Sequence, residues 1–272
     1  MKNIIKLLCI GVIFCALAGA GTAFGETVVI KGSTTVLPVA QGAAEAFMAA
    51  HPGVNISISG GGSGNGIKAL VDKSTDIANA SRFIKDKEVK MAQDNDVYPV
   101  PHRVAMDAIV PIVHTSNPVT GLSIEQLSLI YQGKITNWKE VGGSDLQIVV
   151  VSRDTSSGTY EVWEEQVLHK EKVTPRAQLQ ASNGAVVQAV SKNKYAIGYI
   201  GLGYLNSDVR ALNVNGITAS NASVLSGAYP VARPLFMFTN GWPTGTTAEF
   251  ITFVLSPKGQ EIVKKEGYVP LY

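Results

Sequence analysis

Short hydrophobic runs and breaks rich in glycine or hydroxyl residues alternate along the first third of the chain. Residues 27–30 form an apolar run typical of a strand, and residues 36–50 form an alanine-rich stretch typical of a helix. Apolar and polar residues alternate over residues 54–58, which indicates a second strand. A helix is then expected over residues 66–73 and a strand over residues 76–80. This order predicts an α/β fold with parallel or mixed sheets flanked by helices.

Two longer apolar stretches follow, over residues 103–114 and 229–239. Each is long enough for an extended strand, and the first contains a single acid, Asp107. The pattern between and after them predicts further elements of both kinds. These are strands over residues 146–152 and 196–200, and helices over residues 123–131, 159–169, 183–192, 246–255 and 257–266.

The two long strands bracket the middle of the chain, and the economical interpretation is a molecule of two lobes. The chain starts in one lobe, crosses to the other and returns. We therefore assign residues 26–107 and 233–272 to lobe 1, and residues 108–232 to lobe 2. Two crossings form a hinge and leave a cleft between the lobes, where a ligand can bind.

Capping signals mark the starts of three of the predicted helices. Ser123 and Gln126 have the spacing of a capping box, in which each side chain bonds a backbone N–H of the other residue. Ser256 before Pro257 is a favourable pair for the N-cap and the first helical position. We expect Asn183 to cap the helix that it opens.

The first 25 residues have the layout of a secretory signal peptide. Lys2 and Lys6 form a positive start, and residues 7–20 are almost wholly apolar or small. Ala23 and Gly25 supply the small residues of a cleavage site, so we expect cleavage after Gly25 and export to the periplasm. The alternative is a membrane anchor, but the apolar run is shorter than the roughly 20 residues that a spanning helix needs.

Composition narrows the chemistry of the exported chain. Both cysteines, Cys9 and Cys15, lie inside the leader, which excludes disulfides and thiol chemistry afterwards. Loss of the leader also leaves equal numbers of basic and acidic residues, whereas a nucleic-acid protein is usually basic. The four histidines show no metal-ligand spacing, so we expect neither a metal nor a cofactor.

Three loops, each after a predicted strand and at the start of a helix, carry the candidate chemistry. Unpaired backbone N–H groups and the helix dipole make a helix N-terminus favourable for an anion. A tetrahedral oxyanion needs donors from several directions, which three helix starts can supply. The loops offer Ser33, Thr34 and Thr35 in the first, Ser63 and Gly64 in the second, and Arg153, Ser156, Ser157, Gly158 and Thr159 in the third.

Each loop also has a simpler interpretation. Serine and threonine before a helix are usually caps, and the glycines around Ser63 suit a flexible turn. The second loop is not a Walker A motif, because no Gly-Lys-Ser/Thr follows it. It is also not a hydrolase elbow, since Asn65 stands where the last glycine belongs. The joint occurrence of all three loops favours an oxyanion site.

The order and spacing of these stretches closely resemble a known family, the phosphate-specific solute-binding proteins of ABC transporters. The matching stretches are Gly32-Ser33-Thr34-Thr35, Gly61-Gly62-Ser63-Gly64, Ala80-Ser81-Arg82, Arg153-Asp154-Thr155-Ser156-Ser157-Gly158-Thr159 and Ala196-Ile197-Gly198-Tyr199. The resemblance covers essentially the whole exported chain. It implies a type II periplasmic-binding-protein fold whose two lobes close on phosphate.

The resemblance also implies a ligand set and partners. It implies a protein without enzymatic turnover that delivers phosphate to an inner-membrane ABC permease, and we expect a monomer. The phosphate-binding residues carried over, together with candidates from the loops themselves, are Ser33, Thr34, Thr35, Ser63, Gly64, Ser81, Arg82, Asp107, Arg153, Ser157, Gly158 and Thr159.

One departure from the family concerns the choice between phosphate and sulfate. Some members place acids where Arg82 and Thr155 stand, and such a carboxylate accepts the phosphate proton and repels sulfate. Asp107 is our first candidate for this acceptor, and Asp154 is the second. The alternative is that Asp107 pairs with Arg103 or a backbone group, because buried charges need partners.

Two rival functions remain open at this point. The same fold could bind sulfate, molybdate or tungstate, which the altered acid positions favour. A serine hydrolase or phosphatase with Ser63 or Ser157 as nucleophile is less expected. The sequence near these serines offers no histidine partner, and it shows no metal cluster.

Overall fold

The computed structural model describes residues 27–272. The predicted leader of residues 1–25, with its cleavage site, lies outside the described residues. Within those described, no helix has the length and apolar character needed to cross a membrane.

Strands and helices alternate along much of the described chain. The strands are β1 (Thr27–Gly32), β2 (Asn55–Gly60), β3 (Ile77–Ala80), β4 (Pro99–His114), β5 (Gly121–Leu122), β6 (Val149–Arg153), β7 (Gln178–Gln180), β8 (Ala196–Gly201), β9 (Val209–Ala211), β10 (Asn213–Val214) and β11 (Ala232–Asn240). The α-helices are α1 (Leu37–Ala50), α2 (Ser63–Val71), α3 (Asp86–Gln93), α4 (Ile124–Tyr131), α5 (Gly158–Gln166), α6 (Asn183–Ser191), α7 (Asn221–Leu225), α8 (Gly245–Leu255) and α9 (Pro257–Lys265). Two 3-10 turns cover Trp138–Val141 and Leu202–Tyr204.

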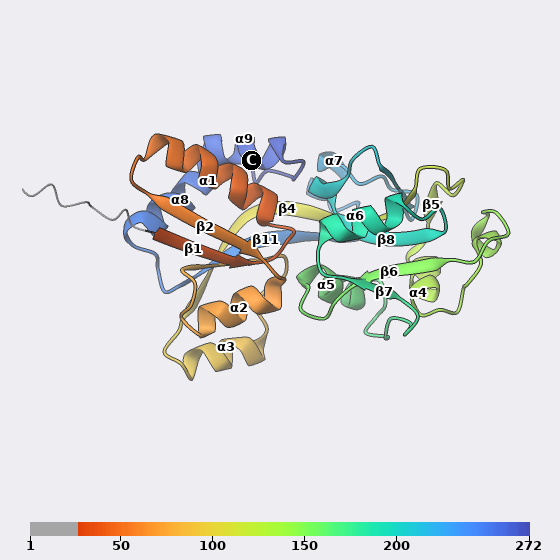
Figure 1. Cartoon of the computed structure of the whole chain (residues 1–272), viewed down its shortest axis with the longest axis horizontal. Coiled ribbons are helices and arrows are strands. Elements are labelled where there is room, and N and C mark those ends of the chain that lie inside the picture. The colour runs from red at the N-terminus through yellow and green to blue at the C-terminus, as the bar shows by residue number, and fades with distance from the viewer. Residues whose placement is uncertain (1–26) are drawn as a thin grey trace, which may run out of the picture.

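A mixed sheet runs through both halves of the described chain, in the order β2-β1-β3-β11-β4-β8-β6-β7, with β9 also paired to β4. Strands β5 and β10 form a separate small sheet. Strands β1, β2 and β3 are parallel, as are β6, β7 and β8. The long strands β4 and β11 pair antiparallel and connect the two halves (Figure 1). The two predicted crossover strands are present, and the structure adds that they are neighbours in the sheet.

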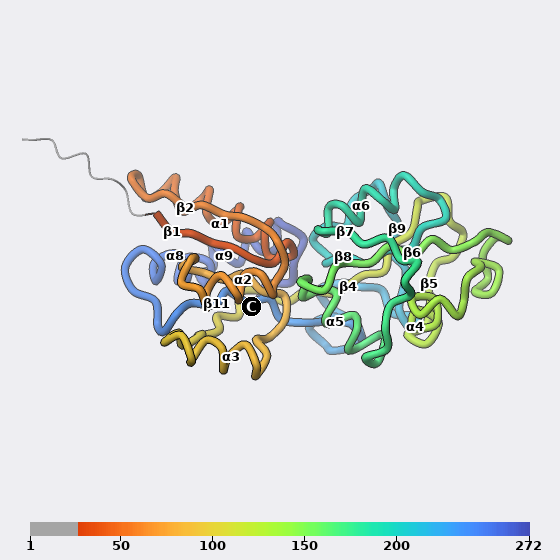
Figure 2. Tube along the Cα trace, turned by 60° about the horizontal axis from the view of Figure 1, so that its bottom comes forward, coloured from red at the N-terminus to blue at the C-terminus, as the bar shows by residue number. Residues whose placement is uncertain are grey.

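The molecule has two lobes, one at each end of these crossover strands (Figure 2). Lobe 1 contains β1–β3, α1–α3, α8 and α9, and lobe 2 contains β5–β10 and α4–α7. The buried apolar side chains separate in nearly the same way, between Ala105 and Ala108 on β4 and between Val231, just before β11, and Leu235 on it. Val269 is an exception, because it packs with the cluster of lobe 2. The lobe boundaries at residues 107/108 and 232/233 stay a prediction.

Several local predictions are confirmed. Ser123 and Gln126 form the expected capping box of α4. The Ser256 hydroxyl accepts from the Gly259 N–H at the start of α9, with Pro257 in the first turn. The prediction for α6 is wrong by one residue, because Ser182 is the cap and Asn183 is the first helical residue. This shift leaves the Asn183 amide free for other bonds.

Two helix bounds also differ from the prediction. Helix α2 begins at Ser63 rather than near Gly66, although Gly64 and Gly66 are poor helix formers. Gly66 has a packing reason, since a Cβ there would lie 2.6 Å from the Gly32 Cα. Helix α5 ends at Gln166, before His169, whose positive φ is incompatible with a continuing helix.

Candidate functional site

The first loop follows β1 and leads into α1. Gly32 has a φ of +132°, and a Cβ there would lie 2.2 Å from the Asn79 carbonyl oxygen, so only glycine fits. The Ser33 N–H donates to the same carbonyl oxygen at 2.8 Å. The Ser33 hydroxyl accepts from the Thr35 N–H at 3.1 Å. These contacts anchor Ser33, Thr34 and Thr35 at the edge of lobe 1 that faces lobe 2.

The second loop turns through Gly61 and Gly62, both with positive φ, into α2. A Cβ on Gly62 would lie 2.6 Å from the Ser156 carbonyl oxygen of lobe 2, and the Gly64 N–H donates to that oxygen at 3.0 Å. The glycines therefore allow the second loop to touch the third directly. At the start of α2, the buried Ser63 hydroxyl accepts from the Ser81 N–H at 3.0 Å and lies 3.3 Å from the Ser81 hydroxyl.

The third loop joins β6 to α5 in lobe 2. The Asp154 carboxylate accepts from the Ser156 N–H at 2.9 Å and also from its hydroxyl, which closes the loop. Ser157 caps α5 by accepting from the Tyr160 N–H at 3.3 Å. A Cβ on Gly158 would lie 2.3 Å from the Ser63 hydroxyl oxygen. The N-termini of α2 and α5 thus face each other in contact, and the structure is a closed form.

Arg153 is the charged group of the third loop. It is 1% exposed, and its Nε and Nη2 donate to the carbonyl oxygens of Gln180 and Ala181 at 3.0 and 2.9 Å. Its Nη1 has no hydrogen-bond partner in the described part of the chain. Burial lowers the pKa of this guanidinium, and no carboxylate forms an ion pair with it there. A buried cation with only carbonyl partners is costly, and an anion bound beside it would compensate that cost.

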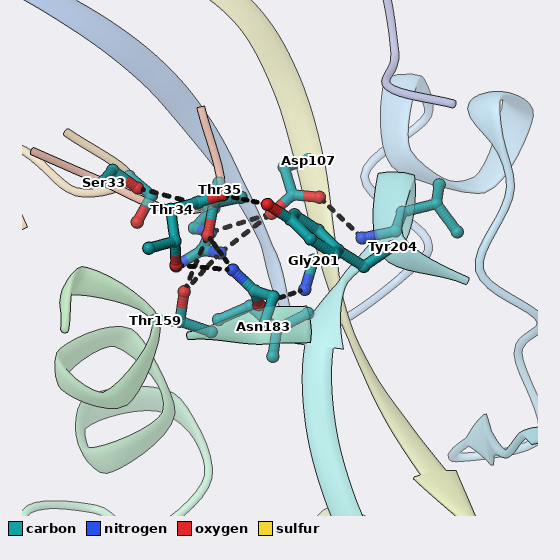
Figure 3. Close-up of polar contacts among 12 residues, drawn as sticks. Ser33, Thr34, Thr35, Asp107, Thr159, Asn183, Gly201 and Tyr204 are labelled. Carbon is teal, nitrogen blue, oxygen red and sulfur yellow. Dashed lines mark hydrogen bonds and ion pairs between the residues drawn. The ribbon is translucent and has the colours of Figure 1, made fainter. Parts of the chain in front are cut away.

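A second group of polar side chains links the lobes beside the loops (Figure 3). The Thr35 and Thr159 hydroxyl oxygens are 2.9 Å apart. The Asn183 amide nitrogen donates to the hydroxyls of Thr34 and Thr35, at 3.1 Å each. Its carbonyl oxygen accepts from the Gly201 N–H at 3.1 Å. Asn183 therefore ties the first loop of lobe 1 to α6 and β8 of lobe 2.

Asp107 is fully buried and belongs to an ion pair with Arg233 of β11. Its Oδ2 accepts from Nε and Nη2 of Arg233 at 3.1 and 2.9 Å, and its Oδ1 accepts from the Leu202 N–H at 2.9 Å. Burial raises the pKa of the Asp107 carboxyl, and Arg233 opposes that rise. The alternative pairing partner Arg103 is exposed, so the pairing of Asp107 is with Arg233 and a backbone group.

Arg82 is held by two carboxylates. Its guanidinium donates to both oxygens of Glu88 at 2.8 and 2.7 Å, and its Nε lies 2.6 Å from the Glu161 carboxylate of α5. Lys85 pairs with the same Glu161 oxygen. The structure therefore places Arg82 in an ion-pair cluster between the lobes, where its charge is already compensated, rather than with the hydroxyls of the loops.

Sequence reasoning missed two buried residues of this region, Asn183 as a side-chain donor and Arg233. A signal for Arg233 was available: it is the one cation of the second apolar strand, and it lies opposite Asp107 in the β4–β11 register. Tyr204 was also missed, and its hydroxyl donates to the Thr34 carbonyl oxygen at 2.6 Å. Burial raises the pKa of Tyr204 to about 12, so this donor keeps its proton at neutral pH.

The arrangement suits binding of an oxyanion. Three kinds of donor suit a negative ligand: buried hydroxyls from both lobes, the facing helix N-termini, and an arginine that has no carboxylate partner within residues 27–272. The hydrogen-bond partners of the Ser63 and Ser157 hydroxyls within residues 27–272 include no histidine. Among the same residues, no group of three or more His, Cys, Asp or Glu side chains is placed to hold a metal.

Fold and site together define a class, the substrate-binding proteins with two α/β lobes around a ligand. The family model of the PBP superfamily domain matches residues 18–258. The phosphate-binding protein PstS of Bacillus subtilis is 33% identical over 244 residues, which cover 89% of this chain and 80% of the relative.

Solved structures agree with this assignment. A Clostridium perfringens structure, described as a phosphate ABC transporter substrate-binding protein with bound phosphate, is 39% identical. It has a TM-score of 0.85 and covers 91% of this chain and 100% of that chain. An ABC-type phosphate transport receptor from Vibrio cholerae is 31% identical, with a TM-score of 0.73 over 89% of this chain and 99% of that chain. The chain belongs to this family of phosphate ABC transporter substrate-binding proteins.

Proposed function

We propose that this protein captures inorganic phosphate between its two lobes and delivers it to an ABC importer. The observation that carries the proposal is Arg153, a buried cation that lacks a carboxylate partner in the described chain and starts the third loop. An oxyanion at this place gains charge-assisted hydrogen bonds and removes the cost of the isolated charge. The Bacillus relative is named a phosphate-binding protein and the Clostridium structure contains bound phosphate, which supports phosphate as the anion here.

The ligand set follows from the loops. In the proposed site, hydroxyls and backbone N–H groups at the starts of α1, α2 and α5 donate to the phosphate oxygens, with Arg153 as the charged donor. Gly62 and Gly158 have no side chain at the contact between the lobes, which lets the second and third loops approach each other closely. The proposed ligands are Ser33, Thr34, Ser63, Ser81, Arg153, Ser157, Gly158 and Thr159. Gly64 is left out, because its N–H already donates to the Ser156 carbonyl oxygen.

The proposal includes the route of the protein. We infer that residues 1–25 direct export, that cleavage follows Gly25, and that the released chain works in the periplasm as a monomer. Its partner is the inner-membrane permease of the importer. Because the site serines lack a histidine partner among residues 27–272, we expect binding without turnover.

One observation favours a second candidate, a fully deprotonated oxyanion such as sulfate or molybdate. Both oxygens of Asp107 already accept hydrogen bonds from the protein, so this carboxylate is poorly placed to accept a ligand proton. Asp154 already accepts from Ser156 through one of its oxygens. A site of donors alone discriminates weakly between phosphate and sulfate.

Calorimetry on protein freed of phosphate by unfolding and refolding tests both candidates. Titration with phosphate, arsenate, sulfate and molybdate is expected to show one tight phosphate site. Absence of heat with phosphate would refute the proposal, and tighter binding of sulfate would establish the second candidate. Release of nitrophenol from p-nitrophenyl phosphate at a rate above that of a Ser157→Ala control would contradict the absence of turnover.

A further inference from the structure

The direction of each hydrogen bond around Thr35 follows from the chemistry of its partners. Within residues 27–272, the Thr35 hydroxyl has three partners: Asn183 Nδ2 at 3.1 Å, Arg233 Nη2 at 3.3 Å and the Thr159 hydroxyl at 2.9 Å. An amide nitrogen and a guanidinium only donate. The Asn183 amide is oriented by the Gly201 N–H, which requires the oxygen on its side. Thr35 therefore accepts twice and must donate its own proton to Thr159.

The same reasoning fixes the role of the Thr159 hydroxyl. It accepts from Thr35 and also from Arg233 Nη2 at 3.0 Å, so both of its lone pairs are used. Its own proton has no acceptor among residues 27–272, and the side chain is buried. Thr159 lies in the first turn of α5, directly after the Gly158 that contacts Ser63. The hydroxyl is therefore committed to donate toward the proposed oxyanion site.

Arg233 is the residue that leaves the Thr159 hydroxyl free only to donate its proton. One Nη2 hydrogen faces Asp107, and the other is shared between the hydroxyls of Thr35 and Thr159. Asp107 holds this guanidinium through Nε and Nη2 and is itself held by the Leu202 N–H. Because β4 and β11 pair at this register, the hinge strands themselves position the arginine.

We propose that Arg233, held by Asp107, is a positioning residue that makes the Thr159 hydroxyl an obligatory donor to the bound phosphate. The inference rests on the proposed function and assigns Asp107 to the support of a donor rather than to the ligand proton. It also couples binding to closure, since Thr35 of lobe 1 and Arg233 of a crossover strand both contact Thr159 of lobe 2.

A double-mutant cycle on phosphate affinity separates the positioning of the Thr159 hydroxyl by Arg233 from a general effect of Arg233 on the structure. Thr159→Val removes the hydroxyl and keeps the shape, and we expect it to weaken phosphate binding about tenfold or more, as for a hydrogen bond to a charged group. Asp107→Asn combined with Arg233→Met removes both buried charges together, which avoids leaving one unpaired. In that background the loss caused by Thr159→Val is expected to shrink at least about threefold, the signature of coupled residues.

The outcomes are distinct. An equal loss from Thr159→Val in both backgrounds would overturn the positioning role, while phosphate binding by the wild type would still support the proposed function. If the wild type binds no phosphate, the proposed function fails first. Arg103→Met, on the exposed side of β4, is the matched control and should leave affinity unchanged. If the paired variant does not fold, Arg233→Lys replaces it in the same cycle. Lysine retains the charge but lacks the planar pair of donors, so a smaller loss from Thr159→Val is again expected, and an equal loss would overturn the positioning role.

Discussion

At the scale of single residues, charge compensation decides what each arginine does. Among residues 27–272, Arg82 has two carboxylate partners and Arg233 has one, whereas the partners of the Arg153 guanidinium are carbonyl oxygens. A guanidinium whose charge is already compensated contributes little additional attraction to an anion. The proposed charged ligand is therefore Arg153 alone, although Arg82 and Arg153 look equivalent in the sequence.

Replacement of Arg153 tests this distinction. Arg153→Met is expected to weaken phosphate binding about a hundredfold, because bonds to a charged group are lost. It should lower the melting temperature of the ligand-free protein little, since it removes a buried cation that has no carboxylate partner in the described chain. Titration calorimetry and thermal unfolding without phosphate measure the two effects. A variant that binds as tightly as the wild type would contradict the role of Arg153.

The residues of the site were partly predictable. Hydroxyls and glycines at helix starts signal donors, and the structure brings Ser63, Ser81 and Gly158 into contact. Their role as phosphate ligands stays a prediction. The partners of Asp107 and Asn183 were not predictable from local pattern, because they depend on strand register and on contacts between lobes. Because the α6 cap was predicted one residue too late, Asn183 was interpreted as a cap and its side-chain bonds to lobe 1 were not predicted.

At the scale of elements, the facing N-termini of α2 and α5 determine how closely the lobes approach. The long strands and the amphipathic helices were predictable to within a few residues because their apolar periods extend over many positions. The strands β5, β7, β9 and β10 have two or three residues each, which is too short for a period to show. None of these short strands forms the contact between α2 and α5.

A single methyl group at that contact gives a direct test. Gly158→Ala places a Cβ within 2.3 Å of the Ser63 hydroxyl oxygen, so α2 and α5 must separate. We expect phosphate affinity to fall about tenfold or more, on the scale of overpacking in a close-packed contact. Gly184→Ala, near the start of α6, is the control, because its nearest neighbour lies 3.9 Å away. Equal affinities of the two variants would contradict the importance of the α2–α5 contact.

At the scale of the whole molecule, two groups of contacts support closure. Asn183, Thr35 and Thr159 join the lobes in the first group. In the second, Arg82 and Lys85 of lobe 1 pair with Glu161 of lobe 2. Ligand affinity depends on the population of the closed form, so contacts far from the ligand also contribute to binding.

Glu161→Gln tests the second of these contacts. Loss of the carboxylate charge weakens the pairing with both cations, and we expect phosphate affinity to fall about threefold or more, in the range of coupled ion pairs. Glu165→Gln is the matched control, because it lies exposed on the same helix. Phosphate titrations of both variants give the comparison, and identical affinities would show that the ion-pair cluster does not support closure.

The most direct test of the central claim is a crystal structure of the protein with bound phosphate. We predict one phosphate between the lobes, with Arg153 Nη1 and the hydroxyls of Ser63 and Thr159 within hydrogen-bond distance of its oxygens. Asp107 should remain paired with Arg233 and should not contact the ligand. Phosphate bound elsewhere, or Arg153 turned away from it, would contradict the account.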